Sequence, residues 1–164
     1  MSDSMYTVSI PVFMQHLNGL SGVLDKAAAW ATARKINEAD LLNMRLSPDM
    51  FNLMRQVRAA TDHAANAAGR LSGKELLKFA NDETTIAQLK ERIAKTIEYL
   101  KSVKQGEVDG TEGKEIKITF PSGALSSFHC GVFWFSCSTA CDAWTARIVA
   151  SWSRRFPGAM ASTS

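Results

Sequence analysis

The chain has 164 residues, which is enough for one domain with a sizeable buried core. Its 19 basic and 16 acidic residues give a net charge of only +3, which argues against nucleic acid or an anionic membrane as a partner. No apolar run approaches the roughly 20 residues of a membrane-spanning helix, and no basic segment followed by an apolar run opens the sequence. The odd number of cysteines, three, fits a reducing compartment. We therefore expect a cytoplasmic protein with no membrane segment.

The first predicted helix runs from about residue 10 to 35. Ser9 followed by Pro11 is typical of a helix start, because proline costs nothing where the backbone N–H groups have no partner. Apolar residues then recur at helical spacing along one face. Residues 37–44 are compatible with a short helical turn after this helix.

A second helix is predicted from Ser47 to Gly73. The run Ser47-Pro48-Asp49 combines a capping hydroxyl, a first-turn proline and an acid near the positive end of the helix dipole. Small alanine side chains dominate the later part of the helix, so a neighbouring helix can approach it closely. Gly73 then ends the pattern.

The third helix has the clearest pattern in the sequence. Thr85 with Gln88 fits a capping box, and apolar residues follow at regular helical spacing to residue 103. The stretch 74–82 is interpreted as a connection with apolar anchors, and the acids Asp82 and Glu83 as part of a solvated turn.

Residues 115–120 alternate with period two, which favours a short strand or hairpin. Three amphipathic helices need a fourth wall to bury their apolar faces, so we expect a last helix over about 126–154. The predicted fold class is therefore mainly α, a four-helix bundle with a short β hairpin or strand before the last helix. We expect residues 1–164 to form a single domain.

Several segments together resemble the DUF1993 family, which is grouped with the DinB/YfiT-like four-helix bundles. The resemblance covers about residues 5–120 and rests on Met5-Tyr6, Val12-Phe13, residues 41–51, Arg55-Gln56-Val57, residues 92–96 and residues 99–103. It implies an up-down-down-up helical bundle, often dimeric, in a superfamily that frequently holds a divalent metal between helices. It implies no demonstrated activity.

The composition changes near Pro121. Residues 119–164 contain Asp142, Arg147, Arg154 and Arg155 as their only charged side chains, together with all three cysteines and three of the four tryptophans. Residues 121–164 also depart from the pattern of the family. One hypothesis is a reading-frame change in the coding sequence; the alternative is a genuine divergent tail.

The candidate metal ligands are His63, in the second predicted helix, and His129, before or within the last. Metal sites of the superfamily typically take one His from the second helix and two His, a turn apart, from the fourth. No second His follows His129 at helical spacing, so this triad is incomplete and no metal ligand is assigned. Cys137 and Cys141 have the i, i+4 spacing that could hold an ion with His63, although small buried side chains are the simpler interpretation.

No phosphate-binding loop, nucleophile elbow or zinc-protease motif occurs, so no catalytic residue is assigned. Two functions from different classes remain open. The first is a cytoplasmic helical-bundle protein without catalytic residues that associates as a homodimer through an apolar face. The second is a DinB-like metal-dependent enzyme, acting on a thiol or a small electrophile with a divalent transition metal as cofactor. The second follows from the resemblance alone.

Overall fold

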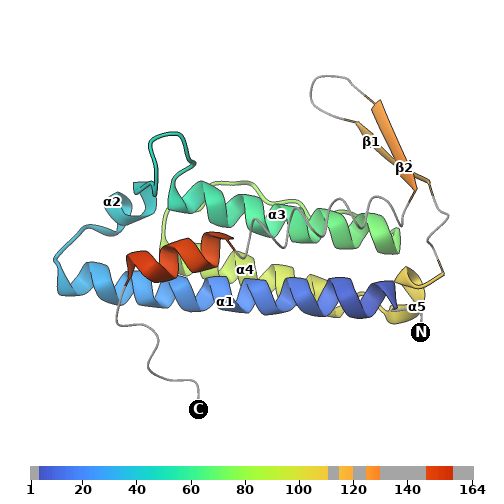
Figure 1. Ribbon diagram of the computed structural model, residues 1–164, viewed down its shortest axis with the longest axis horizontal. Helices are drawn as coiled ribbons and strands as arrows, with labels where there is room; N and C mark the ends of the chain where they lie inside the picture. Colours follow the sequence, from blue (N-terminus) through green and yellow to red (C-terminus); the bar gives the residue numbers. More distant parts are fainter. Residues whose placement is uncertain (1–3, 111–114, 120–124, 130–146, 157–164) are drawn as a thin grey trace, which may run out of the picture.

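A computed structural model describes residues 4–110, 115–119, 125–129 and 147–156, and this part of the chain is mainly helical, as predicted. Three long helices, α1 (Met5–Ala33), α3 (Leu53–Ser72) and α4 (Ile86–Lys101), contact one another, and α4 packs most extensively against the other two (Figure 1). A short helix over residues 147–155, red in Figure 1, lies alongside α1. None of the helices in these described ranges is both long and apolar enough to cross a bilayer.

Helix α1 begins at Met5, five residues before its predicted start. Ser4 caps it by accepting a hydrogen bond from the backbone N–H of Thr7 at 3.3 Å. Pro11 therefore lies inside the helix and not at its first position. Ser9 is buried and is not a cap, because its hydroxyl donates to the backbone oxygen of Met5 at 2.6 Å. The predicted start at residue 10 is wrong because the Ser4 hydroxyl already accepts a hydrogen bond from a free backbone N–H group in the first turn, so the helix can begin at Met5.

The beginning of α3 also differs from its prediction. Asn52 caps this helix by accepting a hydrogen bond from the backbone N–H of Arg55 at 3.0 Å. Ser47 instead donates a hydrogen bond to the carboxylate of Asp49, and the two residues form part of a turn before the helix. The Ser47 hydroxyl therefore bonds to a side chain within the turn and does not cap the helix. At the other end, Gly73 has a left-handed backbone (φ 73°) and ends α3 as predicted.

The helical turn expected at residues 37–44 is present as α2 (Glu38–Asn43). The capping box predicted for Thr85 and Gln88 is confirmed at the start of α4, with both reciprocal hydrogen bonds formed. Glu38 joins these two elements, because its carboxylate accepts from the backbone N–H of Ile86 at 2.5 Å.

A short helix, α5 (Gln105–Val108), follows α4 and closes one end of the helices. Beyond it, β1 (Glu115–Thr119) pairs antiparallel with β2 (Leu125–His129), with Glu115 opposite His129. The predicted last helix over 126–154 is therefore wrong at its start, where the backbone groups pair with β1. Residues 130–146 of that prediction lie outside the described residues, and 147–155 are helical.

The core lies between the three long helices and extends to the helix over 147–155. Ile148, Trp152 and Phe156 are buried together with the apolar faces of the long helices. The ring of Phe156 meets that of Trp30 on α1 edge to face, with 5.2 Å between centroids. Residues 147–156 thus contribute their large apolar side chains to the same core.

Candidate functional site

A cleft lies along α3 in the described part of the chain. Its volume is about 420 Å³, and four of its lining residues, Arg55, Arg58, Ala59 and Asp62, have the spacing of a single helix face. The remaining lining residues are Asn52, Met54 and Asn81. Asn81 comes from the connection between α3 and α4, so the cleft lies between a helix face and a loop.

A buried arginine lies beneath this cleft. Arg92, on α4, is only 2% exposed. Its guanidinium donates to Asp62 at 2.6 Å, to Glu83 at 2.6 Å and to Asn81 at 2.8 Å. It also donates to the hydroxyl of Thr61 at 2.7 Å. A buried charge is tolerated when it is paired and hydrogen-bonded, and this arginine fixes the wall of the cleft by binding α3 and the loop together.

Glu83 is the second charged group of this network. It is 8% exposed and lies 2.8 Å from Nε of Arg58, which also donates to the Glu83 backbone oxygen at 2.5 Å. Burial alone raises the pKa of Glu83, but hydrogen bonds from Arg92 and the nearby positive charges outweigh this effect, so the net pKa is lowered. Glu83 therefore stays ionised and is not part of a solvated turn as predicted.

Arg55 differs from the other two arginines. It is exposed, and its guanidinium lies 4.0 Å from the centroid of the Phe51 ring. No side chain in the described ranges accepts a hydrogen bond from it. The first turn of α3, to which Arg55 belongs, contains no acidic residue, so the positive end of the helix dipole adds to its charge. Arg55 is thus the unmatched positive charge at the rim of the cleft.

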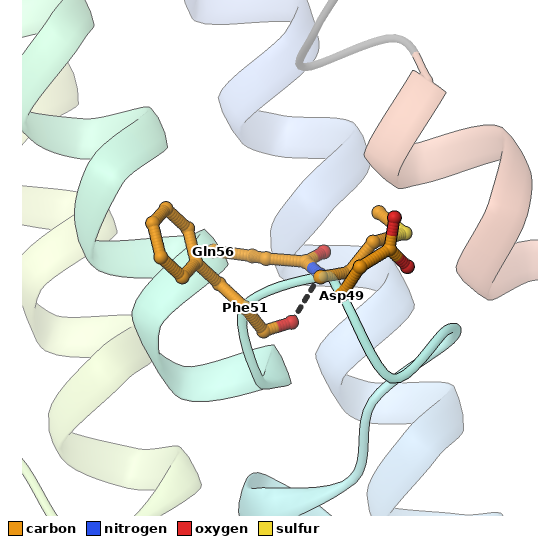
Figure 2. A pocket seen from close by; sticks show the side chains of 4 residues that line it. Asp49, Phe51 and Gln56 are labelled. Atoms are coloured by element: carbon orange, nitrogen blue, oxygen red, sulfur yellow. Dashed lines mark hydrogen bonds between the residues drawn. The ribbon is translucent and has the colours of Figure 1, made fainter.

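A smaller cavity of about 150 Å³ is lined by Asp49, Met50, Phe51 and Gln56 (Figure 2). Both ends of the Gln56 side-chain amide form hydrogen bonds. Its Nε2 donates to the Phe51 backbone oxygen at 2.6 Å, and its Oε1 accepts from Nε1 of Trp152 at 2.9 Å. Gln56 therefore acts as a structural link between the start of α3 and the C-terminal helix.

The two candidate metal ligands, His63 and His129, lie on different elements of the structure. His63 lies on α3, and His129 lies at the end of β2, before the helix over 147–155. His63 is exposed as a residue, yet partial burial lowers its pKa; the charge of Asp62 opposes this effect and Arg70 adds to it. Within the described ranges, no three His, Cys, Asp or Glu side chains are grouped so that they could hold a metal ion. Cys130, Cys137 and Cys141 lie outside those ranges.

Sequence reasoning missed the network around Arg92. The available signal was the position of Arg92 three residues after Leu89, on the apolar face of α4, where a charged residue requires a partner. Its partners could not be identified from spacing, because they come from α3 and from an irregular loop.

Comparison with known families gives a match over most of the chain. A family model described as "Domain of unknown function (DUF1993)" matches residues 5–136. The match extends past residue 120, where the predicted resemblance ended.

Among solved structures, the chain is similar to a DinB family member protein from Shewanella denitrificans. The identity is 28%, the TM-score is 0.80, and the alignment covers 96% of this chain and 88% of that one. The comparison with curated proteins gives no match.

Proposed function

Because this chain belongs to the DUF1993 family, for which no activity is described, we propose a function from its cleft: it binds a small anionic molecule without catalysing a reaction. The observation that carries this proposal is the position of Arg55 at the rim of a cavity of about 420 Å³. Cavities of this size are typical of small-molecule sites.

The charges of the cleft support an anion as the ligand. Arg58 and Arg92 are paired with Glu83 and Asp62, which balances two positive charges with two negative ones. Arg55 is left as the excess charge. The Arg55 guanidinium lies over the Phe51 ring, and a planar guanidinium binds carboxylates and phosphates through two parallel hydrogen bonds.

The experiment is a titration of the protein with acetate, benzoate and inorganic phosphate, followed by NMR chemical-shift changes. We expect saturable shifts at α3 in the wild type and their loss in Arg55→Gln. Arg34→Gln is the matched control, because the Arg34 guanidinium also lies over an aromatic ring, 4.4 Å from the ring centroid of Trp30. Equal responses from both variants, or no saturable response in the wild type, would contradict the proposal.

We also propose that the protein self-associates as a homodimer in the cytoplasm. Phe51 is 47% exposed and is the only large apolar side chain in the described ranges that is so exposed. Sedimentation equilibrium of the wild type and of Phe51→Ala tests this idea. A dimer that dissociates in the variant supports it, and a wild type that is monomeric at high micromolar concentration contradicts it.

The alternative, a DinB-like enzyme that uses a divalent transition metal, draws its support from the family relationship alone. Elemental analysis of purified protein tests it. About one metal ion per chain, lost in His63→Ala, would favour the enzyme over the binding protein.

A further inference from the structure

Asp62 lies at the opposite end of the same cleft from Arg55. Its Oδ1 accepts the hydrogen bond from Arg92 at 2.6 Å, and its side chain is 38% exposed. No group in the described ranges donates a hydrogen bond to its Oδ2. A carboxylate can accept several hydrogen bonds, so Asp62 retains acceptor capacity toward the cleft after binding Arg92.

The distance between these two groups sets the length of a ligand that could contact both. Arg55 and Asp62 are seven residues apart on one face of α3, which corresponds to about 10 Å along the helix axis. Arg58 and Ala59 lie between them and line the same cleft. A ligand that reaches both ends must therefore be elongated.

We propose that the cleft binds an elongated zwitterion, whose carboxylate pairs with Arg55 and whose ammonium group donates to Asp62. This inference rests on the proposed anion-binding function and adds a requirement for a cation at the second end. Arg55 offers hydrogen-bond donors at one end of the cleft, and the carboxylate of Asp62, although paired with Arg92, offers an acceptor at the other. This pair selects a molecule with an anionic acceptor at one end and a cationic donor at the other, because two acceptors brought together in a partly buried site are unfavourable. A dicarboxylate of the same length would place one of its acids against Asp62.

The experiment uses a series of probes of defined length and charge. Glycine, 4-aminobutyrate and 6-aminohexanoate carry the same two charges at increasing separation. Hexanoate lacks the ammonium group, and adipate replaces it with a second acid. Dissociation constants are measured for each probe by NMR titration of the full chain.

We expect 6-aminohexanoate to bind about tenfold more tightly than hexanoate, because its ammonium group adds a charge-assisted hydrogen bond to Asp62, and more tightly than glycine and adipate. Asp62→Asn should reduce its affinity to that of hexanoate and leave hexanoate binding unchanged. Asp25→Asn is the control, because Asp25 forms an exposed ion pair with Lys90 at 2.5 Å on another surface.

The results separate the zwitterion proposal from the anion-binding proposal on which it rests. Equal affinity for hexanoate, glycine and 6-aminohexanoate would overturn the zwitterion and leave the anion site standing. Absence of binding by every carboxylate would overturn both. If Asp62→Asn does not fold, the wild-type series alone still decides, since length and charge are varied in the probe.

Discussion

The indole Nε1 of Trp152 donates a hydrogen bond to Oε1 of Gln56 over 2.9 Å, and both side chains are buried. This bond joins residues 96 positions apart and connects the C-terminal helix to the start of α3. The ring of Trp152 also stacks on that of Phe156, with 5.6 Å between centroids. The helix over 147–155 is thus held by a polar bond within apolar packing.

Trp152→Phe should destabilise the protein by about 1–3 kcal/mol, because the Gln56 oxygen would remain buried without its donor. Trp152→Ala should cost about 3–5 kcal/mol, since a large cavity is added to the lost bond. Urea unfolding followed by circular dichroism measures both. Similar stability of the wild type and both variants would show that the C-terminal helix does not contribute to the folded core.

Replacement of Arg92 by Met should destabilise the protein by about 3–5 kcal/mol, because Glu83 would be left as a buried charge without its strongest partner. Lys95→Met is the matched control on the same helix. Lys95 forms an exposed i, i+4 pair with Glu91 at 2.7 Å, and its loss should cost less than about 1 kcal/mol. Thermal unfolding of the two variants should therefore differ clearly, and equal losses would contradict a structural role for the Arg92 network.

Acid should weaken this same network. Although burial raises the pKa of Glu83, its hydrogen bonds to Arg92 keep the folded-state pKa below the ordinary value of 4.5. The stabilisation is therefore complete above about pH 4.5 and is lost as the pH falls through the lower folded-state pKa. The free energy of unfolding, measured across this range, should fall less steeply in Glu83→Gln than in the wild type. Parallel curves would show that Glu83 makes no such contribution.

The pattern of these residues explains which features could be predicted from the sequence. The capping box of Thr85 and Gln88 is local, so spacing alone identified it. The start of α3 was missed because Ser47 bonds to Asp49 within a turn, and no sequence rule separates that use of a hydroxyl from capping. The role of Arg92 was missed because its partners meet only in the folded chain.

The candidate functional residues also show that residue type can be read from the sequence, whereas the spatial arrangement of ligands cannot. His63 was identified by residue type and helix position, but a metal site depends on where other ligands lie in space. His129 was placed before or within a last helix predicted from about residue 126, whereas Leu125–His129 pair with β1 as a strand. The hypothesis of a reading-frame change stays a prediction, which resequencing of the gene and the intact protein mass would decide.

Gly69 on α3 is required by close packing against Tyr99. A Cβ at this position would lie 2.7 Å from the Tyr99 hydroxyl oxygen, which is held by its hydrogen bond to the Glu75 backbone oxygen at 2.8 Å. Gly69→Ala should therefore destabilise the protein by about 1–3 kcal/mol, despite the better helix propensity of alanine.

Gly22 on α1 is the control for this substitution. A Cβ there meets no atom within 4 Å, so Gly22→Ala should stabilise the protein by about 0.5–1 kcal/mol. Adding Tyr99→Phe to Gly69→Ala should recover part of the loss, because the hydroxyl is removed. Chemical denaturation of the four proteins measures these differences, and a stabilising Gly69→Ala would contradict the packing argument.

His63 should titrate below its ordinary pKa of 6.5, because burial disfavours its charged form more than Asp62 favours it. The unfolded state then binds a proton more readily than the folded state, so stability decreases as the pH falls through about 6.5 toward the folded-state pKa. Removal of the imidazole in His63→Gln should flatten the stability curve in this range. Asp62→Asn should lower the pKa further, as measured by NMR titration of the ring protons, because it removes the charge that opposes the shift. A His63 pKa at or above 6.5 in the wild type would show that the charge of Asp62 dominates over burial at this position.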